Sequence, residues 1–355
     1  MDYKTRSLEI IKKYQSSNGA LVACPNFPAY NYCWLRDGSF IAYSLDLYQE
    51  YQAATAFYNW VNQAISNCSF KMDQLLSKKE QGLKIQSGDV FPTRYTLEGV
   101  EAGDDWGNFQ LDGYGTWLWA LSEHLRITGD HAFIQDFACS IKLTVTYLKN
   151  FWAFPNYDCW EEHSDKTHTS TLACIYGGLK AINRYLEDPE IPPVLASIKR
   201  YVLNNCILQD RLVKYVGNDG VDASLLWVAL PFGLLEADDP IVKNTVREIE
   251  TRLLHNGGVR RYPEDTYYGG GEWPLLSAWL GWYYSKTSRF EEARAILRWI
   301  EAQADQDGQF PEQVTGQGQV NDPAYIEPWI KKWGQVAKPL LWSHAMYLVL
   351  RNQLK

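Results

Sequence analysis

The sequence predicts an all-α protein built as an (α/α)6 toroid, in which six outer helices surround six inner ones. Two observations lead to this prediction. Apolar residues recur with the 3.6-residue period of helices along most of the 355-residue chain, whereas strand-like alternation is scarce. The connections between the helical segments alternate between short and long. Six helical hairpins with this alternation describe a toroid whose long loops share one face, where an active site is expected.

Some of the helices expected from this periodicity have start signals in the sequence, and the helices fall into two kinds. Pro240 stands at a first helical turn, and residues 288–291 have the pattern of a capping box. Every second helix mixes small residues with aromatic ones, as in residues 113–120 and 174–179, and is interpreted as an inner helix because small residues allow close packing on all sides. The predicted helices are 4–16, 37–50, 52–67, 112–128, 130–152, 168–187, 192–206, 222–234, 240–254, 274–287, 289–304 and 339–353.

Composition and charge limit the domain organisation and the partners. Residues 1–355 contain no linker rich in glycine, serine or proline, so a single catalytic domain is predicted. The net charge of −8 argues against a nucleic-acid partner. The seven cysteines lack CxxC spacing and are interpreted as buried free thiols. Without an apolar signal core or a run of eighteen apolar residues, we expect a cytoplasmic protein with no membrane partner.

Aromatic residues are abundant and stand beside polar or charged ones in the predicted long loops. The chain holds 15 Trp and 23 Tyr, which indicates an aromatic-lined cleft, although a large core with Trp as filler is the alternative. Aromatic faces stack on sugar rings, acidic side chains bind hydroxyls, and two carboxyl groups can break a glycosidic bond. The sequence therefore indicates a sugar hydrolase. The clusters are Trp34-Leu-Arg36-Asp37, Trp106 with Gln110-Leu-Asp112, Trp160-Glu161-Glu162, Arg261-Tyr-Pro-Glu-Asp265 and Pro311-Glu312-Gln313.

Three of these clusters also have a simpler interpretation. Glu161 and Glu162 taken alone would be an exposed acidic pair, and Glu312 taken alone would be an ordinary loop glutamate. Asp37 at a helix start is favoured by the helix dipole.

His163 and His168 have no partner at metal-ligand spacing, and the acidic stretch at residues 305–312 is too short for a calcium loop, so no metal and no cofactor are expected.

Taken together, the clusters resemble glycoside hydrolase family 15, the glucoamylases, glucodextranases and related α-glucosidases. The resemblance runs from Tyr30 to about Leu354, and the motifs follow the order of that family. The stretch from Arg261 to Tyr268, followed by Trp273, is the most specific match. The other matching segments are Tyr30-Asn-Tyr-Cys-Trp-Leu-Arg-Asp37, Trp106-Gly107 with Gln110-Leu-Asp-Gly113, Asp158-Cys-Trp-Glu-Glu162, Pro311-Glu-Gln313 and Leu341-Trp-Ser-His-Ala345.

The resemblance implies a role for each candidate residue. Glu161 is expected to be the catalytic acid and Glu312 the catalytic base, and an inverting glycosidase holds such a pair about 6.5–9.5 Å apart. Glu162 is expected to bind sugar at the site entrance. The remaining substrate-binding residues implied are Arg36 and Asp37 at the terminal glucose, Arg261 beyond the scissile bond, Trp106 and Trp273 against the sugar rings, and Tyr30, Trp34 and Trp160 beside them.

The function expected is an inverting, exo-acting α-glucosidase that releases β-glucose from short α-glucosides. The chain has no room for the β-sandwich or starch-binding domain of larger members, so short imported oligosaccharides are the expected substrates. Isomaltose is favoured, with maltose-type sugars next. The alternatives are a trehalase, an inverting disaccharide phosphorylase of the same fold, or a non-catalytic carbohydrate-binding module. The only partner expected is a small oligosaccharide, and the protein is expected to be a monomer or a weak homo-oligomer.

Overall fold

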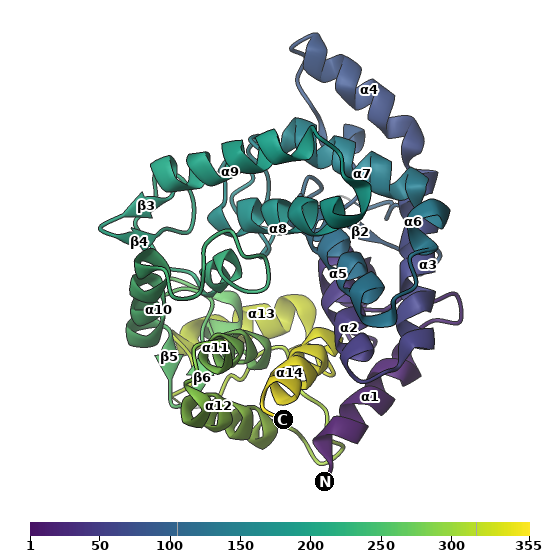
Figure 1. Cartoon of the computed structure of the whole chain (residues 1–355). Coiled ribbons are helices and arrows are strands. Elements are labelled where there is room, and N and C mark those ends of the chain that lie inside the picture. Colours follow the sequence, from purple (N-terminus) through teal and green to yellow (C-terminus); the bar gives the residue numbers. More distant parts are fainter. Residues whose placement is uncertain (105, 317) are drawn as a thin grey trace. The chain divides into compact units, whose positions relative to one another are not determined.

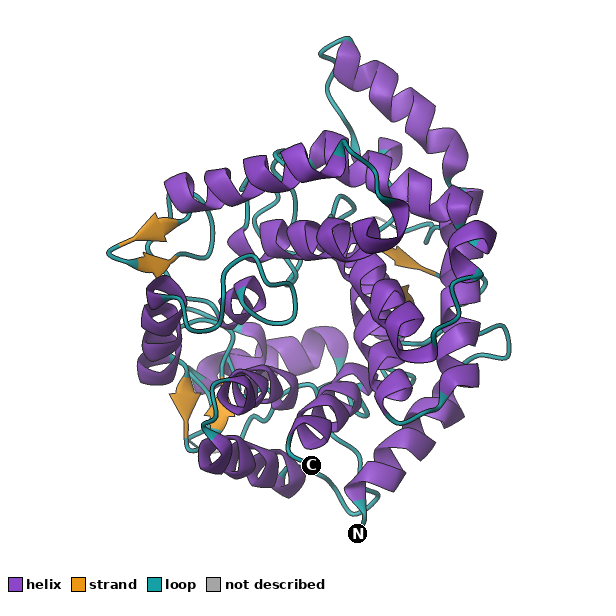
Figure 2. Ribbon diagram, viewed as in Figure 1, coloured by secondary structure: helices purple, strands orange, loops and turns teal. Residues whose placement is uncertain are grey.

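The chain folds into helices joined by alternating short and long connections (Figure 2). The computed structural model describes residues 1–104, 106–316 and 318–355. Its residues group into two compact units. Unit 1 comprises Met1–Tyr14, Val22–Asn31 and Cys206–Lys355, and unit 2 comprises Gln15–Leu21 and Tyr32–Asn205. None of the described helices combines the length and the apolar character that crossing a membrane requires.

Unit 2 consists of helical hairpins with long loops between them (Figure 1). A two-stranded antiparallel ladder, in which Trp34 pairs with Arg94, precedes the first of these helices. The helices α2, α5 and α8 are buried along nearly their whole length, whereas α3, α7 and α9 bury one face. The elements are β1 (Cys33–Trp34), α2 (Leu35–Leu47), α3 (Tyr51–Asn67), α4 (Ser69–Glu80), η2 (Ser87–Asp89), β2 (Arg94–Tyr95), α5 (Asp112–Thr128), α6 (Phe133–Asp136), α7 (Ala138–Phe151), α8 (Thr169–Leu186) and α9 (Ile191–Asn205).

Close packing in unit 2 depends on glycines at the helix crossings. A Cβ atom on Gly178 of α8 would lie 2.2 Å from the carbonyl oxygen of Gly115 in α5. A Cβ atom on Gly115 would lie 2.4 Å from the carbonyl oxygen of Cys174. Real Cβ atoms do not approach backbone this closely, so only glycine permits this crossing. The small residues in these two helices therefore do what the sequence pattern predicted.

Unit 1 contains the remaining helices and four short 3-10 helices that shape its loops. Helices α11 and α14 are buried on all sides and pack against each other, and α1 packs against α14. The elements are α1 (Tyr3–Tyr14), η1 (Pro28–Tyr30), β3 (Ile207–Leu208), β4 (Arg211–Leu212), η3 (Ala223–Val228), α10 (Pro240–Arg252), β5 (Leu254–His255), β6 (Gly258–Val259), η4 (Tyr267–Gly269), α11 (Pro274–Lys286), α12 (Phe290–Ala302), η5 (Pro323–Tyr325), α13 (Ile326–Trp333) and α14 (Leu341–Gln353).

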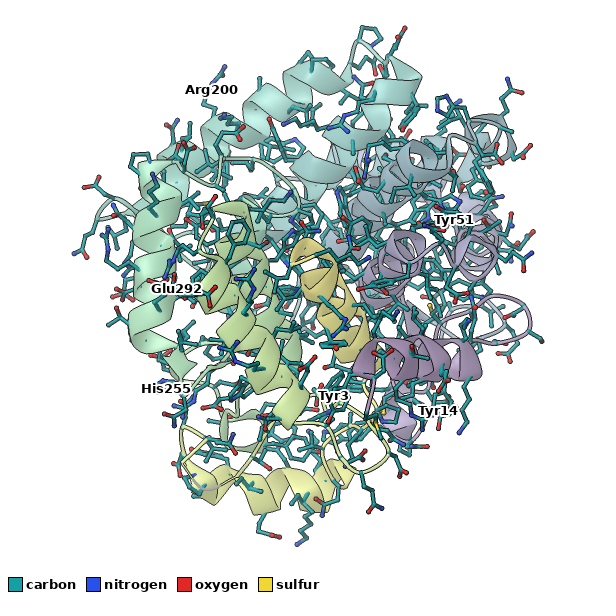
Figure 3. All side chains as sticks on the ribbon, turned by 60° about the horizontal axis from the view of Figure 1, so that its bottom comes forward. Tyr3, Tyr14, Tyr51, Arg200, His255 and Glu292 are labelled. Atoms are coloured by element: carbon teal, nitrogen blue, oxygen red, sulfur yellow. The ribbon has the colours of Figure 1, made fainter. Side chains whose placement is uncertain are left out.

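The outward faces of both units carry the charged side chains. Arg200 on α9 of unit 2 and Glu292 on α12 of unit 1 are exposed, and Figure 3 shows both among the side chains at the surface. On the inner helices, Arg36 and Asp37 in the first turn of α2 are buried, whereas Arg126 of α5 and Arg184 of α8, near the ends of their helices, are exposed. A buried charge requires a partner or a function, so these positions lead to the candidate site.

Several helix predictions were wrong in detail. The helix predicted at 222–234 is the short 3-10 helix η3, because Pro231 cannot donate a helical hydrogen bond and Gly233 has a positive φ of 59°. The helix predicted at 130–152 breaks at Phe137 into α6 and α7. The capping box predicted at Ser288 does not form, because this residue has a φ of 62° and α12 begins at Phe290.

Two further helices lie within predicted loops, and one cysteine differs from its predicted environment. α4 occupies part of the predicted loop 68–111, where Met72 and Leu75 are buried at helical spacing. α13 occupies part of the predicted loop 305–338. All seven cysteines are free, but Cys139 is exposed, whereas the other six are buried as predicted.

Candidate active site

The first turn of α2 places a buried arginine and aspartate at one end of unit 2. Arg36 and Asp37 follow directly after the β1 strand, and both are nearly inaccessible to solvent. The Arg36 Nη1 group donates to Gln110 Oε1 at 3.0 Å and to Asp112 Oδ2 at 2.9 Å, while its Nε lies 3.6 Å from Asp37 Oδ2. One guanidinium therefore organises two carboxyl groups and an amide in a buried cluster.

Packing between two helix starts brings Asp112 to Arg36. Asp112 is the first residue of α5, and a Cβ atom on the next residue, Gly113, would lie 3.3 Å from the backbone nitrogen of Arg36. The glycine thus lets the start of α5 approach the start of α2. Gln110 and Asp112 belong to a cluster visible in the sequence, but sequence reasoning assigned neither of them a role in the site.

Some buried polar atoms of this cluster form no hydrogen bond with any described residue. Among the described residues, Asp37 Oδ2 and Asp112 Oδ1 accept no hydrogen bond, and Gln110 Nε2 donates none. Burial is the main cause that raises the pKa of Asp37 to about 7, against the attraction of Arg36. Buried acceptors and donors of this kind suit a ligand that carries many hydroxyl groups.

The loop that carries Glu161 folds back onto β1. The indole Nε1 of Trp34 donates to Glu161 Oε1 at 2.6 Å, although the two residues are 127 positions apart in the chain. Glu161 has a left-handed backbone with a φ of 66°, which is a strained conformation for a glutamate. Asp158 Oδ1 holds the turn by accepting hydrogen bonds from the backbone N–H groups of Trp160 at 3.0 Å and Glu162 at 2.9 Å. The local structure is therefore built around the position of Glu161.

The surroundings of Glu161 favour its protonated form. Desolvation is the largest influence and raises the pKa of Glu161, whereas Arg36 and the hydrogen bond from Trp34 act in the opposite direction. A raised pKa is what a general acid needs near neutral pH. The indole that donates to this carboxyl group belongs to Trp34, on a segment far from Glu161 in the chain.

An aromatic wall stands beside Trp34 and contains an arginine that sequence reasoning missed. The ring of Trp106 lies edge-on to Trp34, with 6.0 Å between the ring centroids. The guanidinium carbon of Arg94 lies 3.7 Å from the Trp106 ring centroid and 4.0 Å from that of Tyr32, and Arg94 also pairs with Asp104. Arg94 reaches this position because β2 pairs with β1. It stands in a loop without a motif, so the sequence contains no signal for its role.

Glu312 lies in unit 1, and its loop is attached to the last helix. Glu312 is only 3 % exposed, and its backbone N–H donates to the carbonyl oxygen of Ala337 at 2.9 Å. The carbonyl oxygen of Pro311 accepts a hydrogen bond from Ser343 Oγ at 2.8 Å. The backbone N–H of Phe310 donates to His344 Nε2 at 3.1 Å. Three contacts therefore fix the backbone on both sides of Glu312.

The histidine that anchors this loop stays neutral. Because His344 Nε2 accepts from Phe310, the ring proton is on Nδ1, which lies 2.9 Å from Ser7 Oγ. Burial lowers the pKa of His344 to about 3, so the ring keeps this tautomer across the physiological range. The match of Leu341-Trp-Ser-His-Ala345 to the last inner helix thus coincides with a structural support for the Glu312 loop.

Arg261 is held by a neighbouring aspartate. Its Nε donates to Asp265 Oδ2 at 2.7 Å, and Nη2 donates to the other oxygen of the same carboxylate. The guanidinium carbon also lies 5.2 Å from the Tyr267 ring centroid and 5.4 Å from that of Trp273. The two-point pairing fixes the plane of the guanidinium group against these rings.

Tyr267 connects the predicted residues of unit 1 and is a further residue that sequence reasoning left without a role. Its hydroxyl lies 2.9 Å from that of Tyr30, and its ring centroid lies 6.2 Å from that of Trp273. Burial and then the Glu312 carboxyl group raise the pKa of Tyr267, so Glu312 belongs to the same cluster. Gln313, expected to bond beside Glu312, instead accepts the backbone N–H of Gly271 at 2.9 Å.

The predicted site residues thus form two sets, each inside one unit. Unit 2 holds one set and unit 1 the other. The set in unit 2 is Trp34, Arg36, Asp37, Trp106, Trp160, Glu161 and Glu162, and the set in unit 1 is Tyr30, Arg261, Trp273 and Glu312. That both sets act on one substrate remains a prediction.

The chain is similar to known glycosidases along nearly its whole length. Residues 3–315 match the family model of glycosyl hydrolases family 15. An isomaltose glucohydrolase from Kribbella flavida is 39 % identical over 352 residues, which are 97 % of this chain and 90 % of that protein. A glycosidase variant in complex with glucose has 38 % identity and a TM-score of 0.95, covering 99 % of this chain and 96 % of the other.

A more distant likeness identifies the fold. The glucoamylase from Saccharomycopsis fibuligera is 15 % identical and has a TM-score of 0.77, covering 99 % of this chain and 94 % of the other. Glucoamylases have the (α/α)6 toroid fold. The fold class predicted from helix periodicity and loop lengths is therefore confirmed.

Proposed function

Since the chain belongs to glycosyl hydrolases family 15, we propose that it is an inverting, exo-acting α-glucosidase of short α-glucosides. The observation that carries this proposal is the hydrogen bond from Trp34 to Glu161 beside the buried cluster of Arg36, Asp37 and Asp112. This arrangement places a carboxyl group of raised pKa beside buried groups that can bind hydroxyls. Isomaltose is the favoured substrate, because the relative from Kribbella flavida is an isomaltose glucohydrolase.

Glu161 acts as the general acid. Desolvation keeps a larger fraction of this carboxyl group protonated than in an exposed glutamate, so it can donate its proton to the glycosidic oxygen. The bond between that oxygen and the anomeric carbon then breaks, and the leaving sugar departs as an alcohol. Trp34 limits the rise in pKa and stabilises the carboxylate that remains.

Glu312 acts as the general base. It takes a proton from a water molecule, whose oxygen attacks the anomeric carbon on the face opposite to the leaving group. The configuration inverts, and an α-glucoside yields β-glucose. The backbone contacts around Glu312 fix the loop that carries this carboxyl group.

The remaining residues bind the sugar. Arg36 and Asp37 receive the hydroxyl groups of the terminal glucose, which explains attack at the chain end. Trp34 and Trp106 pack against this sugar. Arg261 binds the sugar beyond the scissile bond, together with Tyr30, Trp160, Glu162 and Trp273.

We also propose a reducing compartment for this protein and a low oligomeric state. All seven cysteines are free thiols, as is usual in the cytoplasm, where short imported sugars would be hydrolysed. A monomer or a weak homo-oligomer is expected, and analytical ultracentrifugation at several concentrations distinguishes the two.

Proton NMR of the anomeric signals tests the reaction directly. The enzyme is mixed with isomaltose, maltose or trehalose, and the glucose released first is identified before mutarotation. Initial β-glucose with isomaltose as the fastest substrate supports the proposal. Initial α-glucose would exclude inversion and the roles of Glu161 and Glu312. Turnover that requires added phosphate would indicate a phosphorylase, and binding without turnover would indicate a binding module.

Replacing either glutamate separates the acid from the base. Glu161→Gln and Glu312→Gln are each expected to lower kcat on isomaltose by about 10²–10⁴-fold, because general acid–base catalysis is lost. On α-glucosyl fluoride, whose leaving group needs no proton, Glu161→Gln should retain most activity and Glu312→Gln should not. The exposed glutamates Glu190 and Glu327 provide matched Glu→Gln controls, one in each unit. Equal loss of both substrates in Glu161→Gln would contradict the acid role.

A further inference from the structure

Unit 2 contains a cavity whose lining includes Trp106 of the aromatic wall. Its volume is about 390 Å³, near the lower end of the range of about 300–1,000 Å³ for small-molecule sites. The loops at residues 85–90, 106–109 and 156–164 line it. Trp106 is the one predicted site residue in this lining, and neither Arg36, Asp37 nor Glu161 belongs to it.

The lining of this cavity is uncharged. Among the described residues that line it, none is acidic or basic, which argues against a phosphate, a nucleotide or a metal ion as its ligand. The lining instead combines the aromatic rings of Trp106, Phe109 and Tyr157 with the hydroxyl and amide groups of Ser87 and Asn156. Rings for stacking and neutral polar groups for hydroxyls are the elements of a carbohydrate site.

A buried amide oxygen gives the cavity a built hydrogen-bond acceptor. Asn156 is 1 % exposed, and its Nδ2 donates to the carbonyl oxygen of Phe154 at 2.9 Å, which identifies the other amide atom as Oδ1. No described residue donates a hydrogen bond to Asn156 Oδ1, and none accepts one from the buried Trp106 Nε1. A buried polar atom without a partner is unfavourable, so both atoms favour a ligand with hydroxyl groups.

Backbone geometry fixes the rings around this acceptor. A Cβ atom on Gly107 would lie 2.9 Å from the Tyr157 ring, so the glycine lets this ring pack against the backbone beside Trp106. Phe109 has a φ of 80°, and its carbonyl oxygen accepts the backbone N–H of Tyr157 at 3.1 Å. A strained backbone held by such a contact is found more often at functional sites than elsewhere.

From these observations we propose that this cavity is a second binding site for a neutral sugar, in which Asn156 Oδ1 accepts from a sugar hydroxyl and Trp106 and Tyr157 contact the ring. The sugar is either a free glucose or the far end of a longer isomalto-oligosaccharide. Both have the same chemistry, and they differ in whether glucose alone is sufficient. The proposal does not depend on the catalytic roles of Glu161 and Glu312.

The indole N–H signals of Trp34 and Trp106, compared with and without variants that block the cavity, distinguish the two sites, because Trp106 is also proposed to pack against the terminal glucose. Trp34 donates to Glu161, whereas Trp106 lines the cavity. In protein labelled with ¹⁵N at its tryptophans, spectra of Trp34→Phe and Trp106→Phe assign these signals. The background is the full chain with Glu312→Gln, which leaves unit 2 unchanged and slows hydrolysis. The probes are glucose and isomaltotriose, titrated in parallel.

Filling the cavity from its exposed rim tests the site without disturbing the core. Ser87 and Ser164 line the cavity and are exposed, so Ser87→Phe and Ser164→Phe block it from two sides. Ser197→Phe, on the exposed face of α9, is the matched control. We expect each cavity variant to weaken the sugar response of Trp106 by about tenfold, comparable to losing one hydrogen bond and its packing. The response of Trp34 should stay as in the control.

The results of these titrations distinguish free glucose from a longer chain. They also distinguish failure of this proposal from failure of the proposed function. A Trp106 response to glucose that the cavity variants weaken indicates a free sugar, and such a response to isomaltotriose alone indicates the far end of a bound chain. A Trp106 signal that moves with neither sugar, or with unchanged affinity in both cavity variants, overturns the proposal. A responsive Trp106 beside a silent Trp34 would leave the cavity standing and contradict the proposed function instead. The unperturbed Trp34 signal verifies that each variant is folded.

Discussion

At the scale of single residues, Trp34 affects the pKa of Glu161. Its indole N–H donates to the carboxyl group at 2.6 Å, and a donated hydrogen bond stabilises the carboxylate more than the acid. Desolvation works in the opposite direction and dominates, so the pKa of Glu161 is raised. Arg36 is the largest of the influences that lower this pKa, and the hydrogen bond from Trp34 is the next, which one substitution can remove.

Trp34→Phe should shift the pH dependence in a defined direction. Without the indole N–H, the pKa of Glu161 rises further, so the protonated acid persists to higher pH. We expect the alkaline limb of the kcat/KM profile on isomaltose to move to higher pH. Trp152→Phe, at a tryptophan of unit 2 that packs against Tyr201, is the control. An alkaline limb that stays in place or moves to lower pH would show that Trp34 does not set this pKa.

Asp37 links the substrate site to stability. An unfolded aspartate titrates near 3.8, whereas burial raises the pKa of Asp37 to about 7 in the folded protein. Between these pH values the folded state holds a proton that the unfolded state has released. The free energy of unfolding therefore decreases as pH rises from about 4 to about 7, and stays lower above this range.

Asp37→Asn should remove this pH-dependent loss. At each pH we compare the Tm of Asp37→Asn with that of the parent chain. We expect this difference, variant minus parent, to be larger at pH 8 than at pH 4 by about 3 °C or more. The same substitution should lower kcat/KM about 10–10²-fold through the lost contact with sugar hydroxyls. Thermal unfolding at both pH values measures the first effect, with the exposed Asp73→Asn as control. An equal Tm difference at both pH values would show that Asp37 is ionised in both.

At the scale of elements, the crossing of α5 and α8 supports the site. Gly115 and Gly178 meet there with no room for a methyl group, and α5 begins with Asp112, the partner of Arg36. Any outward movement of α5 would also move Asp112 and Gln110. The same pair of glycines therefore supports stability and, in the proposed function, the binding of substrate.

Gly178→Ala should be strongly destabilising. The added Cβ would lie 2.2 Å from the carbonyl oxygen of Gly115, so the two helices must separate, and we expect a loss of about 3 kcal/mol or more in the free energy of unfolding. Chemical denaturation followed by circular dichroism measures it. Gly103→Ala, where nothing lies within 4 Å of the new atom, is the control. A loss as small as that of the control would contradict this packing.

At the scale of the whole molecule, the two glutamates proposed as acid and base come from different compact units. Unit 2 carries Glu161 on a loop built around Asp158 and Trp34, and unit 1 carries Glu312 on a loop held by Ser343 and His344. Each unit prepares its own carboxyl group. The proposed reaction needs both, because protonation of the leaving group and deprotonation of water belong to one step.

The double variant Glu161→Gln/Glu312→Gln tests this joint action. Residues that act as a unit are not additive, so we expect the double variant to be about as slow on isomaltose as the slower single variant. Steady-state kinetics of the two single variants and the double variant provide the comparison. Losses that multiply would mean that the two glutamates act independently.

The sequence alone was sufficient for much of the architecture and for the motifs. Helix periodicity and loop length are local properties, and they predicted the inner and outer helices and the glycines of α5 and α8. Their failure at 222–234 has a local reason as well, because Pro231 and Gly233 interrupt the helix. The motifs around Glu161 and Glu312 identified both candidate carboxyl groups before any contact was known.

The tertiary structure decided the partners of these residues. Trp34 meets Glu161 across 127 positions and Arg36 meets Asp112 across 76, and neither distance leaves a periodic signal in the chain. Arg94 and Tyr267 acquire their roles through strand pairing and ring packing in the same way. The physical reason is that a pKa or a hydrogen bond depends on which side chains the packed helices bring together, whereas sequence patterns describe only one element at a time.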